Sequence, residues 1–249
     1  MIDIHTHILP SIDDGADNVS VSAEMLRMEV EQGVKEVVFT PHYYGKETAE
    51  EFLAKRAAAR QSIEEYIPRG LKVRCGAEIL LTGVNDPTDE AICALAIEGT
   101  KCVMFELPFS SRWSERLLDR IADFIAETGY TPIIAHVERY VEALENPEIL
   151  TYLVQIGCLI QINTHAFKEK VTRRFALALM KHGLVHCIGT DAHDTHKRTP
   201  DYTLAKEIIR KKKRIDEFTN AQWCMKKILA GEALRNPYSS VKKWGKYYF

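Results

Sequence analysis

The chain has 249 residues, of which 46% are hydrophobic, and it can therefore bury the core of one (β/α)-barrel domain. Its 33 basic and 35 acidic residues give a formal net charge of -2, so no global positive field recruits nucleic acid or anionic lipid. No apolar run approaches the roughly 20 residues of a membrane span, and the opening MIDIHTHILP lacks the pattern of a signal peptide. We expect a cytoplasmic protein with a single domain over residues 1–249.

The six cysteines are scattered singly through apolar segments, without a C-x-x-C pair or a disulfide-like framework. A cysteine nucleophile for phosphate transfer usually has an arginine six residues later, and none of these cysteines does. We expect reduced, mostly buried thiols and no cysteine-phosphatase chemistry. The residues concerned are Cys75, Cys93, Cys102, Cys158, Cys187 and Cys224.

Short apolar runs alternate along the chain with segments of helical periodicity. The predicted strands are 2–4, 37–40, 73–76, 103–105, 133–135, 159–162 and 185–189. The predicted helices are 20–32, 48–66, 113–128, 146–156, 169–182, 201–212 and 216–230, with a weaker segment at 88–98. This alternation predicts an α/β fold with a mainly parallel sheet and helices outside it. Seven strands favour a distorted (β/α)7 TIM-like barrel over a regular eight-stranded one.

Two segments near the end of the chain carry many basic residues. Residues 206–214 are expected to form the solvated face of a helix. Residues 241–249 mix lysines with aromatic side chains and are expected to dock on the barrel or on another subunit.

Histidines and carboxylates recur at the ends of the predicted strands. His5 and His7 are two residues apart on the first strand, so their side chains project from the same face. His42 follows the second strand and Glu78 the third. Asp14 lies in a Ser-Ile-Asp-Asp-Gly turn, where a metal ligand and an aspartate that caps its own backbone are both plausible readings.

The same pattern continues through the second half of the chain. Glu106 and His136 directly follow the fourth and fifth strands, and Asp191 and His193 close the seventh. A carboxylate at the end of a buried strand is costly unless it is paired or binds a cation. Because the carboxyl ends of barrel strands form one face, these residues predict a metal site there. Imidazole and carboxylate donors without thiolates suit manganese, iron or zinc in a catalytic cluster.

Four histidines and two arginines complete the polar inventory. His182 at a helix end, His186 beside the seventh strand and His196 on a loop are expected to be structural, whereas His165 could line the cavity. Arg139 and Arg198 each follow a predicted ligand on the same rim. A guanidinium beside a metal cluster suits phosphate, and the alternative for either arginine is a surface salt bridge.

The segments that carry these residues resemble the polymerase and histidinol phosphatase (PHP) superfamily. More narrowly, the chain is similar to bacterial manganese-dependent protein-tyrosine phosphatases encoded with capsule and exopolysaccharide genes. The resemblance runs from residue 1 to about residue 235, in matching order and spacing. Its motifs are the opening His5-Thr6-His7, Asp13-Asp14-Gly15, Thr40-Pro41-His42, Gly76-Ala77-Glu78, Phe105-Glu106, Ala135-His136-Val137-Glu138-Arg139 and Thr190-Asp191-Ala192-His193.

The resemblance implies one PHP-type metallophosphatase domain with a three-ion cluster, with Mn²⁺ as the expected metal and iron or zinc as alternatives. Arg139 and Arg198 match the family's substrate-binding arginines. In the implied arrangement, one ion is held by His5, His7, Glu78 and Asp191, a second by Asp14, His42 and His193, and a third by Glu106 and His136 together with a bridging Glu78.

The implied reaction is hydrolysis of phosphotyrosine on the tail of a bacterial tyrosine kinase that controls polysaccharide export. A hydroxide held between two ions would attack phosphorus, since metal binding lowers the pKa of water. The alternatives are a phosphatase for a small metabolite such as histidinol phosphate, a non-catalytic scaffold that binds a partner, and a metal-dependent amidohydrolase. The sequence leaves the native metal and the oligomeric state open.

Overall fold

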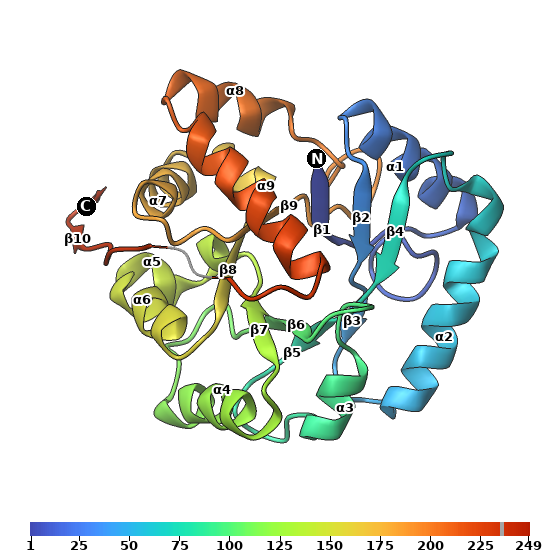
Figure 1. Cartoon of the computed structure of the whole chain (residues 1–249), viewed down its shortest axis with the longest axis horizontal. Helices are drawn as coiled ribbons and strands as arrows, with labels where there is room; N and C mark the ends of the chain where they lie inside the picture. The colour runs from blue at the N-terminus through green and yellow to red at the C-terminus, as the bar shows by residue number, and fades with distance from the viewer. Residues whose placement is uncertain (235–236) are drawn as a thin grey trace.

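Parallel strands form the centre of the molecule and curl round a common axis, with most of the helices on the outside (Figure 1). The computed structural model describes residues 1–234 and 237–249. The central strands are β1 (Ile2–Thr6), β2 (Glu36–Phe39), β3 (His42–Tyr43), β4 (Lys72–Cys75), β5 (Glu78–Leu80), β6 (Cys102–Glu106), β7 (Thr131–Ile134), β8 (Leu159–Asn163) and β9 (Cys187–Gly189).

The seven predicted strands occur in the predicted order, but the second and third are each split into two segments. β1, β2 and β4 form one parallel sheet, and β3, β5, β6, β7, β8 and β9 form the other. The break in the second strand falls at Pro41, which has no N–H to donate to a ladder. The circuit closes where Thr6 pairs in parallel with Ala192 just beyond β9. The expected distorted barrel of parallel strands is confirmed.

The helices connect successive strands and match the predicted segments within a few residues for the most part. The predicted helix 48–66 ends at Ser62 and is followed by a short 3₁₀ turn, and the segment 88–98 is helical only to Ala94. One short helix, α5, was not predicted. The α-helices are α1 (Val19–Glu31), α2 (Ala49–Ser62), α3 (Asp89–Ala94), α4 (Glu115–Thr128), α5 (Val141–Glu145), α6 (Glu148–Gln155), α7 (Lys170–Lys181), α8 (Thr203–Lys211) and α9 (Ile215–Leu229), and the 3₁₀ helices are η1 (Glu64–Tyr66), η2 (Val137–Arg139) and η3 (Thr164–Phe167).

Alternate residues of the strands enter two separate apolar clusters. Val37 and Ile160 face outward and pack against the helices, whereas their neighbours Val38 and Leu159 point into the barrel. This follows from the period of two in a strand, since successive side chains point to opposite faces. The barrel interior is therefore a packed core along part of its length.

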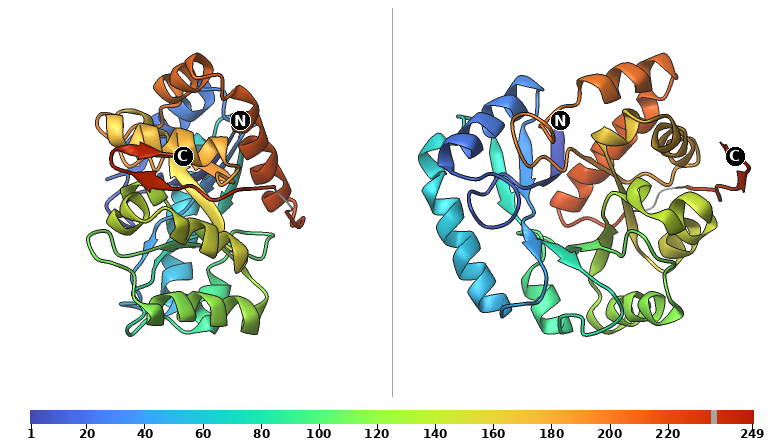
Figure 2. Two further views of the ribbon diagram at one scale, coloured as in Figure 1. Left: turned by 90° about the vertical axis from the view of Figure 1, so that its left-hand side faces the viewer. Right: turned by 180° about the vertical axis from the view of Figure 1, so that it is seen from behind.

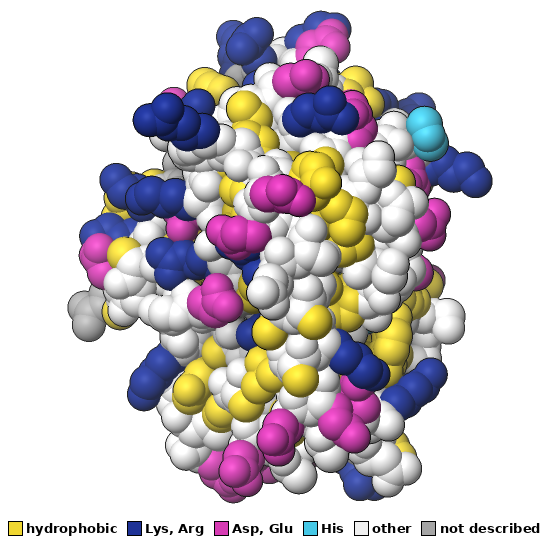
Figure 3. All heavy atoms as spheres, turned by 90° about the vertical axis from the view of Figure 1, so that its right-hand side faces the viewer, with side chains coloured by type: hydrophobic (Ala, Val, Ile, Leu, Met, Phe, Trp, Pro, Cys, Tyr) yellow, Lys and Arg dark blue, Asp and Glu magenta, His cyan; other side chains and the backbone are white. Residues whose placement is uncertain are grey.

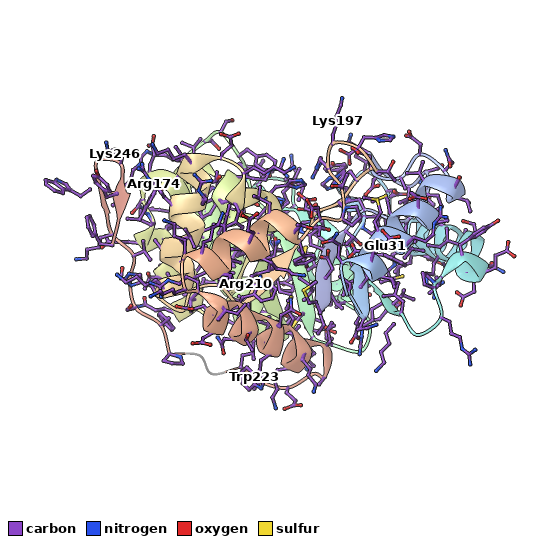
Figure 4. The ribbon with its side chains drawn as sticks, turned by 90° about the horizontal axis from the view of Figure 1, so that it is seen from above. Glu31, Arg174, Lys197, Arg210, Trp223 and Lys246 are labelled. Atoms are coloured by element: carbon purple, nitrogen blue, oxygen red, sulfur yellow. The ribbon has the colours of Figure 1, made fainter. Side chains whose placement is uncertain are left out.

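Helix α9 differs from the expectation that all helices lie outside the sheet. Its residues Met225, Ile228 and Leu229 belong to the interior cluster of the barrel. The Gln222 side chain both accepts from the Ile2 amide at 2.7 Å and donates to the Ile2 carbonyl at 3.2 Å, which fixes α9 at the start of β1. In Figure 4, Trp223 on α9 and Lys197 on the loop after β9 lie on opposite sides of the molecule. Helix α9 thus closes the amino-terminal end of the barrel.

The two basic segments behave largely as expected. Residues 242–249 form a hairpin of β10 (Lys243–Trp244) and β11 (Tyr247–Tyr248) beside α7, so the expected docking on the barrel is confirmed (Figure 2, left). The Tyr248 ring packs 5.0 Å from Phe175, and its hydroxyl donates to the Leu144 carbonyl at 3.1 Å. The charged side chains of 210–213 are exposed. Within the described ranges, no helix is both long and apolar enough to cross a membrane.

Candidate metal centre

The nine predicted metal ligands lie together at the carboxyl-terminal end of the barrel, the end opposite α9. Seven of them are buried, His42 is partly exposed and Asp14 is largely exposed. The carboxyl ends of parallel strands meet on one face, so residues distant in the sequence converge there. The buried members are His5, His7, Glu78, Glu106, His136, Asp191 and His193.

The donor atoms of this cluster fall into three groups, and within each group they lie within 4.8 Å of one another. The first group matches the ligand set expected for the first ion, and the second adds His7 to the set expected for the second ion. The groups are His5, His7, Glu78 and Asp191, then His7, Asp14, His42 and His193, then His42, Glu78 and Glu106.

Glu78 lies at the centre of the cluster. Its Oε1 is 2.6 Å from Nε2 of His136, and its Oε2 is 3.1 Å from Nδ1 of His42 and 3.2 Å from Nε2 of His5. His136 also approaches Glu106 at 3.5 Å, but the third donor group contains His42 in the place of the expected His136, so the ligand set of the third ion stays a prediction. A carboxylate with histidines around both oxygens is positioned to bridge two cations.

The electrostatics keep the central carboxylates ionised. Burial alone would raise the pKa of Glu78, but the positive charge of His5 and His136 outweighs it and holds that pKa well below its usual range. Burial likewise opposes ionisation of Asp191, but the positive charge of His5 together with the contact with His7 at 3.4 Å holds its pKa well below the ordinary value. The centre therefore offers anionic oxygens to a cation.

The histidines divide into two kinds. Burial disfavours the charged form of His7 and His136, yet contacts with Asp13, Asp191 and Glu78 raise the pKa of His7 well above its usual range, and Glu78 is the main cause that raises that of His136 to about 9. Burial and the charge of His7 lower the pKa of His42 and bring that of His193 to about 2. A divalent cation would replace the protons that His7 and His136 carry in its absence.

Several buried polar atoms in the cluster have no hydrogen-bond partner among the described residues. Although Nδ1 of His42 and Oε2 of Glu78 are 3.1 Å apart, neither makes a hydrogen bond. Oδ1 of Asp191 and Nε2 of His193 are also buried and make no hydrogen bond. Buried polar atoms without a hydrogen-bond partner are costly in free energy. A cation bound between these converging nitrogen and oxygen atoms would give them a partner. The residues present fit a cluster of divalent metal ions.

One supporting residue, Asp13, was not predicted. Its Oδ2 is 2.7 Å from Nδ1 of His7 and accepts from the His42 amide at 2.9 Å, while its Oδ1 accepts from the Gly15 amide at 2.9 Å. The turn-capping aspartate in this loop is therefore Asp13, which leaves Asp14 to face the cluster. Gly15 is required because a Cβ there would lie 2.2 Å from the His7 carbonyl oxygen.

Two further supporting residues come from β8. Oε1 of Gln161 accepts from the His136 amide at 2.5 Å and lies 3.4 Å from Nδ1 of His5, and its Nε2 donates to Asn163 at 2.8 Å. Asn163 in turn donates to Asp191 at 2.8 Å. These contacts orient the cluster side chains. The signal in the sequence was the polar pair two residues apart in an otherwise apolar strand.

Two cluster residues have a left-handed backbone conformation. His136 has φ of 31° and Asp191 has φ of 53°. This region is unfavourable for side chains other than glycine, although histidine and aspartate occur there more often than most. Such strain gathers at functional sites, and here both residues are the second after a strand, where the turn aims the side chain at the cluster.

Both predicted arginines meet the cluster through Asp191. Oδ2 of Asp191 accepts from Arg139 at 3.1 Å and pairs with Arg198 at 2.7 Å, while Oδ1 faces His5 and His7 at 3.4 Å. The guanidinium groups are partly exposed, at 41% and 34%. Arg139 and Arg198 therefore lie at the edge of the metal centre and do not form surface salt bridges away from it.

Two aromatic side chains flank the cluster and were not predicted. The Tyr44 ring stacks on His42 with centroids 5.1 Å apart, and the Phe109 ring stacks on His136 at 5.5 Å. Arg139 lies over the Phe109 ring at 4.6 Å. Tyr44 and Phe109 are thus aromatic walls on two sides of the same centre.

The remaining histidines stay outside the three donor groups. His186 is buried and accepts from the Ile160 amide at 3.1 Å, His182 ends α7, and His196 is exposed on a loop, as expected. His165 lies on η3, half-buried, and joins none of the groups. Burial raises the pKa of all six thiols, which agrees with the expectation that no cysteine is a nucleophile.

A parallel barrel with buried histidines and carboxylates at its carboxyl end, bordered by arginines, defines a metal-dependent hydrolase. A family model described as capsular polysaccharide synthesis, CpsB/CapC, matches residues 1–227. Because that match spans most of the chain, the protein belongs to the CpsB/CapC family of metal-dependent tyrosine phosphatases of capsular polysaccharide synthesis.

Individual relatives agree with this assignment. The chain is 36% identical over 222 residues to the tyrosine-protein phosphatase YwqE of Bacillus subtilis, covering 84% of this chain and 85% of the relative. It is 32% identical to the tyrosine-protein phosphatase CpsB of Streptococcus pneumoniae, covering 85% and 90%. A crystal structure from work on YwqE and CpsB, described as unique metal-dependent tyrosine phosphatases, superposes with a TM-score of 0.79 at 29% identity and covers 98% of this chain and 100% of that one.

Proposed function

We propose that this chain hydrolyses phosphotyrosine in a protein substrate, with divalent ions held by the nine clustered residues. The observation that carries the proposal is the convergence of buried histidines and ionised carboxylates beside two arginines at one end of the barrel. The names of the relatives support the substrate class.

We propose manganese as the native metal, in a cluster of three ions. Imidazole and carboxylate donors without thiolates favour metals of this hardness, and iron and zinc are the alternatives. Bound ions would supply Lewis acidity, which lowers the pKa of water toward neutrality and neutralises charge on the phosphoryl oxygens.

The chain's own residues prepare the site for a phosphoryl group. Asp191 holds Arg139 and Arg198 at one edge of the cluster, and each guanidinium keeps further N–H groups for phosphoryl oxygens. Asp13 fixes the ring of His7, and Gln161 fixes the backbone of His136. These contacts hold the donors in place before substrate arrives, which lowers the cost of reorganisation during the reaction.

The walls of the site favour a flat aromatic leaving group. Tyr44 and Phe109 present their rings on two sides of the cluster, where the phenyl ring of phosphotyrosine can pack between or against them. Asp14, Arg139 and Arg198 are partly exposed, so the rim is open to a peptide chain. We propose that the physiological substrate is the phosphorylated tail of a bacterial tyrosine kinase.

The direct test compares three substrates under identical conditions with added manganese: a phosphotyrosine peptide, the matching phosphoserine peptide and histidinol phosphate. We expect the highest kcat/KM for the phosphotyrosine peptide. Faster turnover of histidinol phosphate would assign the chain to small-metabolite chemistry instead. No turnover of any substrate by the metal-loaded protein would favour a non-catalytic scaffold.

The aromatic walls can be tested separately. Tyr44→Ala and Phe109→Ala should raise KM for the phosphotyrosine peptide more than for a phosphate ester without a ring, because only the aromatic substrate loses ring contacts. Tyr44→Phe keeps the ring and is the matched control, so it should stay near wild type. Equal effects on both substrates would mean that these rings do not contact the leaving group.

A further inference from the structure

A cavity lies on the outside of the barrel, between α7, α8 and the β10–β11 hairpin. Its volume is about 550 Å³, which is within the usual range for small-molecule sites. In Figure 4, Arg174 on α7 and Lys246 on the hairpin lie at the same end of the molecule. Segments distant in the sequence therefore build one concave surface away from the metal centre.

Five cationic side chains line this cavity. Lys170, Arg173 and Arg174 come from the first two turns of α7, and Lys211 and Lys212 come from the end of α8. We call the cavity they line the basic pocket. Cations at the start of a helix oppose its dipole, so this arrangement of α7 costs stability rather than adding to it.

The positive charge of the basic pocket is poorly neutralised within the described part of the chain. Lys211 pairs with Glu207 on its own helix at 2.7 Å, and this is the sole ion pair found for the five cations among the described residues. Arg173 donates to the Phe167 carbonyl at 3.4 Å, and Arg174 lies 5.8 Å from the centre of the Tyr247 ring. A carbonyl and a ring hold these side chains in place without cancelling their charge.

The hairpin adds to the charge instead of opposing it. Lys243 lies over the Tyr248 ring at 5.9 Å and Lys246 over the Tyr247 ring at 5.5 Å. The opposite face of the molecule differs, because acidic and basic side chains are interspersed there (Figure 3). With a net charge of -2 over the whole chain, this gathering of cations is a local feature.

The lining of the basic pocket also has an apolar part. Leu177, Ile208 and Tyr248 line it together with the cations, and the Tyr248 ring packs on Phe175. Charges beside an apolar, concave surface are screened less than charges on an open surface, so an anion bound here gains more than at a flat lysine patch.

We propose that the basic pocket binds a small anion that carries two or more linked phosphate groups. One phosphate can engage two or three of the cations, and the others remain for a second phosphate. Nucleoside triphosphates and inorganic polyphosphate share this chemistry. The site is separate from the metal centre, so the proposal stands whatever the chain hydrolyses.

The first test is protection of lysines in the full, metal-loaded chain. Amine acetylation is followed by mass spectrometry with and without inorganic tripolyphosphate, with magnesium in excess so that the anion does not strip the centre. Lys170, Lys211 and Lys212 should be protected, whereas the exposed Lys72 and Lys101 elsewhere on the barrel should not. Equal protection of both sets, or of neither, overturns the proposal.

The second test uses matched charge changes and calorimetric titration. Arg173→Glu with Lys212→Glu should weaken tripolyphosphate binding by about tenfold or more, because two charge-assisted contacts are replaced by repulsion. Lys72→Glu with Lys101→Glu makes the same change in net charge and should bind like wild type. If the first pair fails to fold, Arg173→Gln with Lys212→Gln replaces it. Equal weakening in the control pair means non-specific attraction and contradicts the proposal.

Two further ligands complete the titration. Orthophosphate should bind much more weakly than tripolyphosphate, and equal affinity would contradict the need for linked phosphates. ATP that binds more tightly than tripolyphosphate supports the proposal with a nucleotide as the ligand. Tighter tripolyphosphate binding supports it with an inorganic polyphosphate.

Discussion

The two ends of the barrel have opposite chemistry although the same strands build both. At the amino-terminal end, Met225, Ile228 and Leu229 of α9 fill the interior with apolar side chains. At the carboxyl-terminal end, the interior holds histidines and carboxylates with unsatisfied donor atoms. Burial of apolar side chains therefore stabilises the fold at the amino-terminal end. At the carboxyl-terminal end, burial of the polar side chains becomes favourable only when a cation is bound. Changes at the two ends should separate stability from activity.

The largest effect is expected from Glu78→Gln at the polar end. Glu78 contacts three histidines within 3.2 Å and belongs to two of the three donor groups, so its loss should remove charge from both of them. Turnover of a phosphotyrosine peptide should fall about a thousandfold or more, with fewer metal ions per chain. Elemental analysis beside kcat measures both, and near-normal turnover with full metal content would remove Glu78 from the centre.

Met225→Ala is the corresponding change at the apolar end. Met225 is fully buried in the interior cluster, so truncation should lower the free energy of unfolding by about 2–5 kcal/mol. Activity of the folded variant at 25 °C should stay close to wild type. Urea unfolding measures the loss, and Trp223→Ala, on the exposed face of the same helix, is the control that should change little. A large drop in kcat without loss of stability would contradict the separation.

Replacing the arginines should have a smaller effect on catalysis than replacing Glu78. Arg139→Ala and Arg198→Ala should each lower kcat/KM by about a hundredfold, with part of the loss in kcat, if the guanidinium binds the transition state more tightly than the substrate. Arg139→Lys and Arg198→Lys should recover only part, because an ammonium keeps the charge but not the planar fork. The measurement is kcat and KM of each variant on a phosphotyrosine peptide, with its metal content determined. Wild-type values in both alanine variants would show that the arginines take no part in the reaction.

The smallest effect concerns a buried pair of carboxyl groups behind the centre. Burial raises the pKa of Asp3 to about 6, and burial together with the charge of Asp3 raises that of Glu29 well above its usual range. These groups hold protons more tightly when folded than when unfolded. The contribution of Asp3 to stability is therefore fully present below the ordinary carboxyl pKa and is lost as the pH rises through about 6, and that of Glu29 is lost as the pH rises through its own raised pKa.

Glu29→Gln should reduce this pH dependence, because the amide cannot ionise. Between pH 5 and pH 8, the free energy of unfolding of the variant should decline by on the order of 1 kcal/mol less than that of wild type. Urea unfolding of metal-free protein across this range measures the difference. Parallel curves for the two proteins would show that the pair does not titrate in that window.

The sequence predicted the strands well because their signal is local. A buried strand must be apolar over several residues, and the ligand that ends it must be polar, so both the seven strands and the nine clustered residues could be read from the chain. The interruption at Pro41 follows from its missing N–H but depends on how the neighbouring strands pair.

Other features could not be predicted because they depend on contacts between distant segments. The pattern of α9 shows an apolar face but not that this face enters the barrel end beside Ile2. Asp13 has no local mark that separates it from an ordinary turn aspartate, and the polar pair of Gln161 and Asn163 in β8 does not show which histidines it meets. The ligand assignments within the cluster stay predictions until metal is measured in variants.

The closure of the amino-terminal end of the barrel by α9 has a consequence for synthesis of the chain. Ile2 leaves the ribosome 220 residues before its hydrogen-bond partner Gln222, and the apolar side chains of α9 emerge together with Gln222. Until then, the interior surface of the half-made barrel faces solvent or a chaperone. Contacts of such long sequence separation also slow folding. Nascent chains that stop before α9 should therefore be prone to aggregation and to proteolysis, even though every residue of the catalytic cluster has already been made.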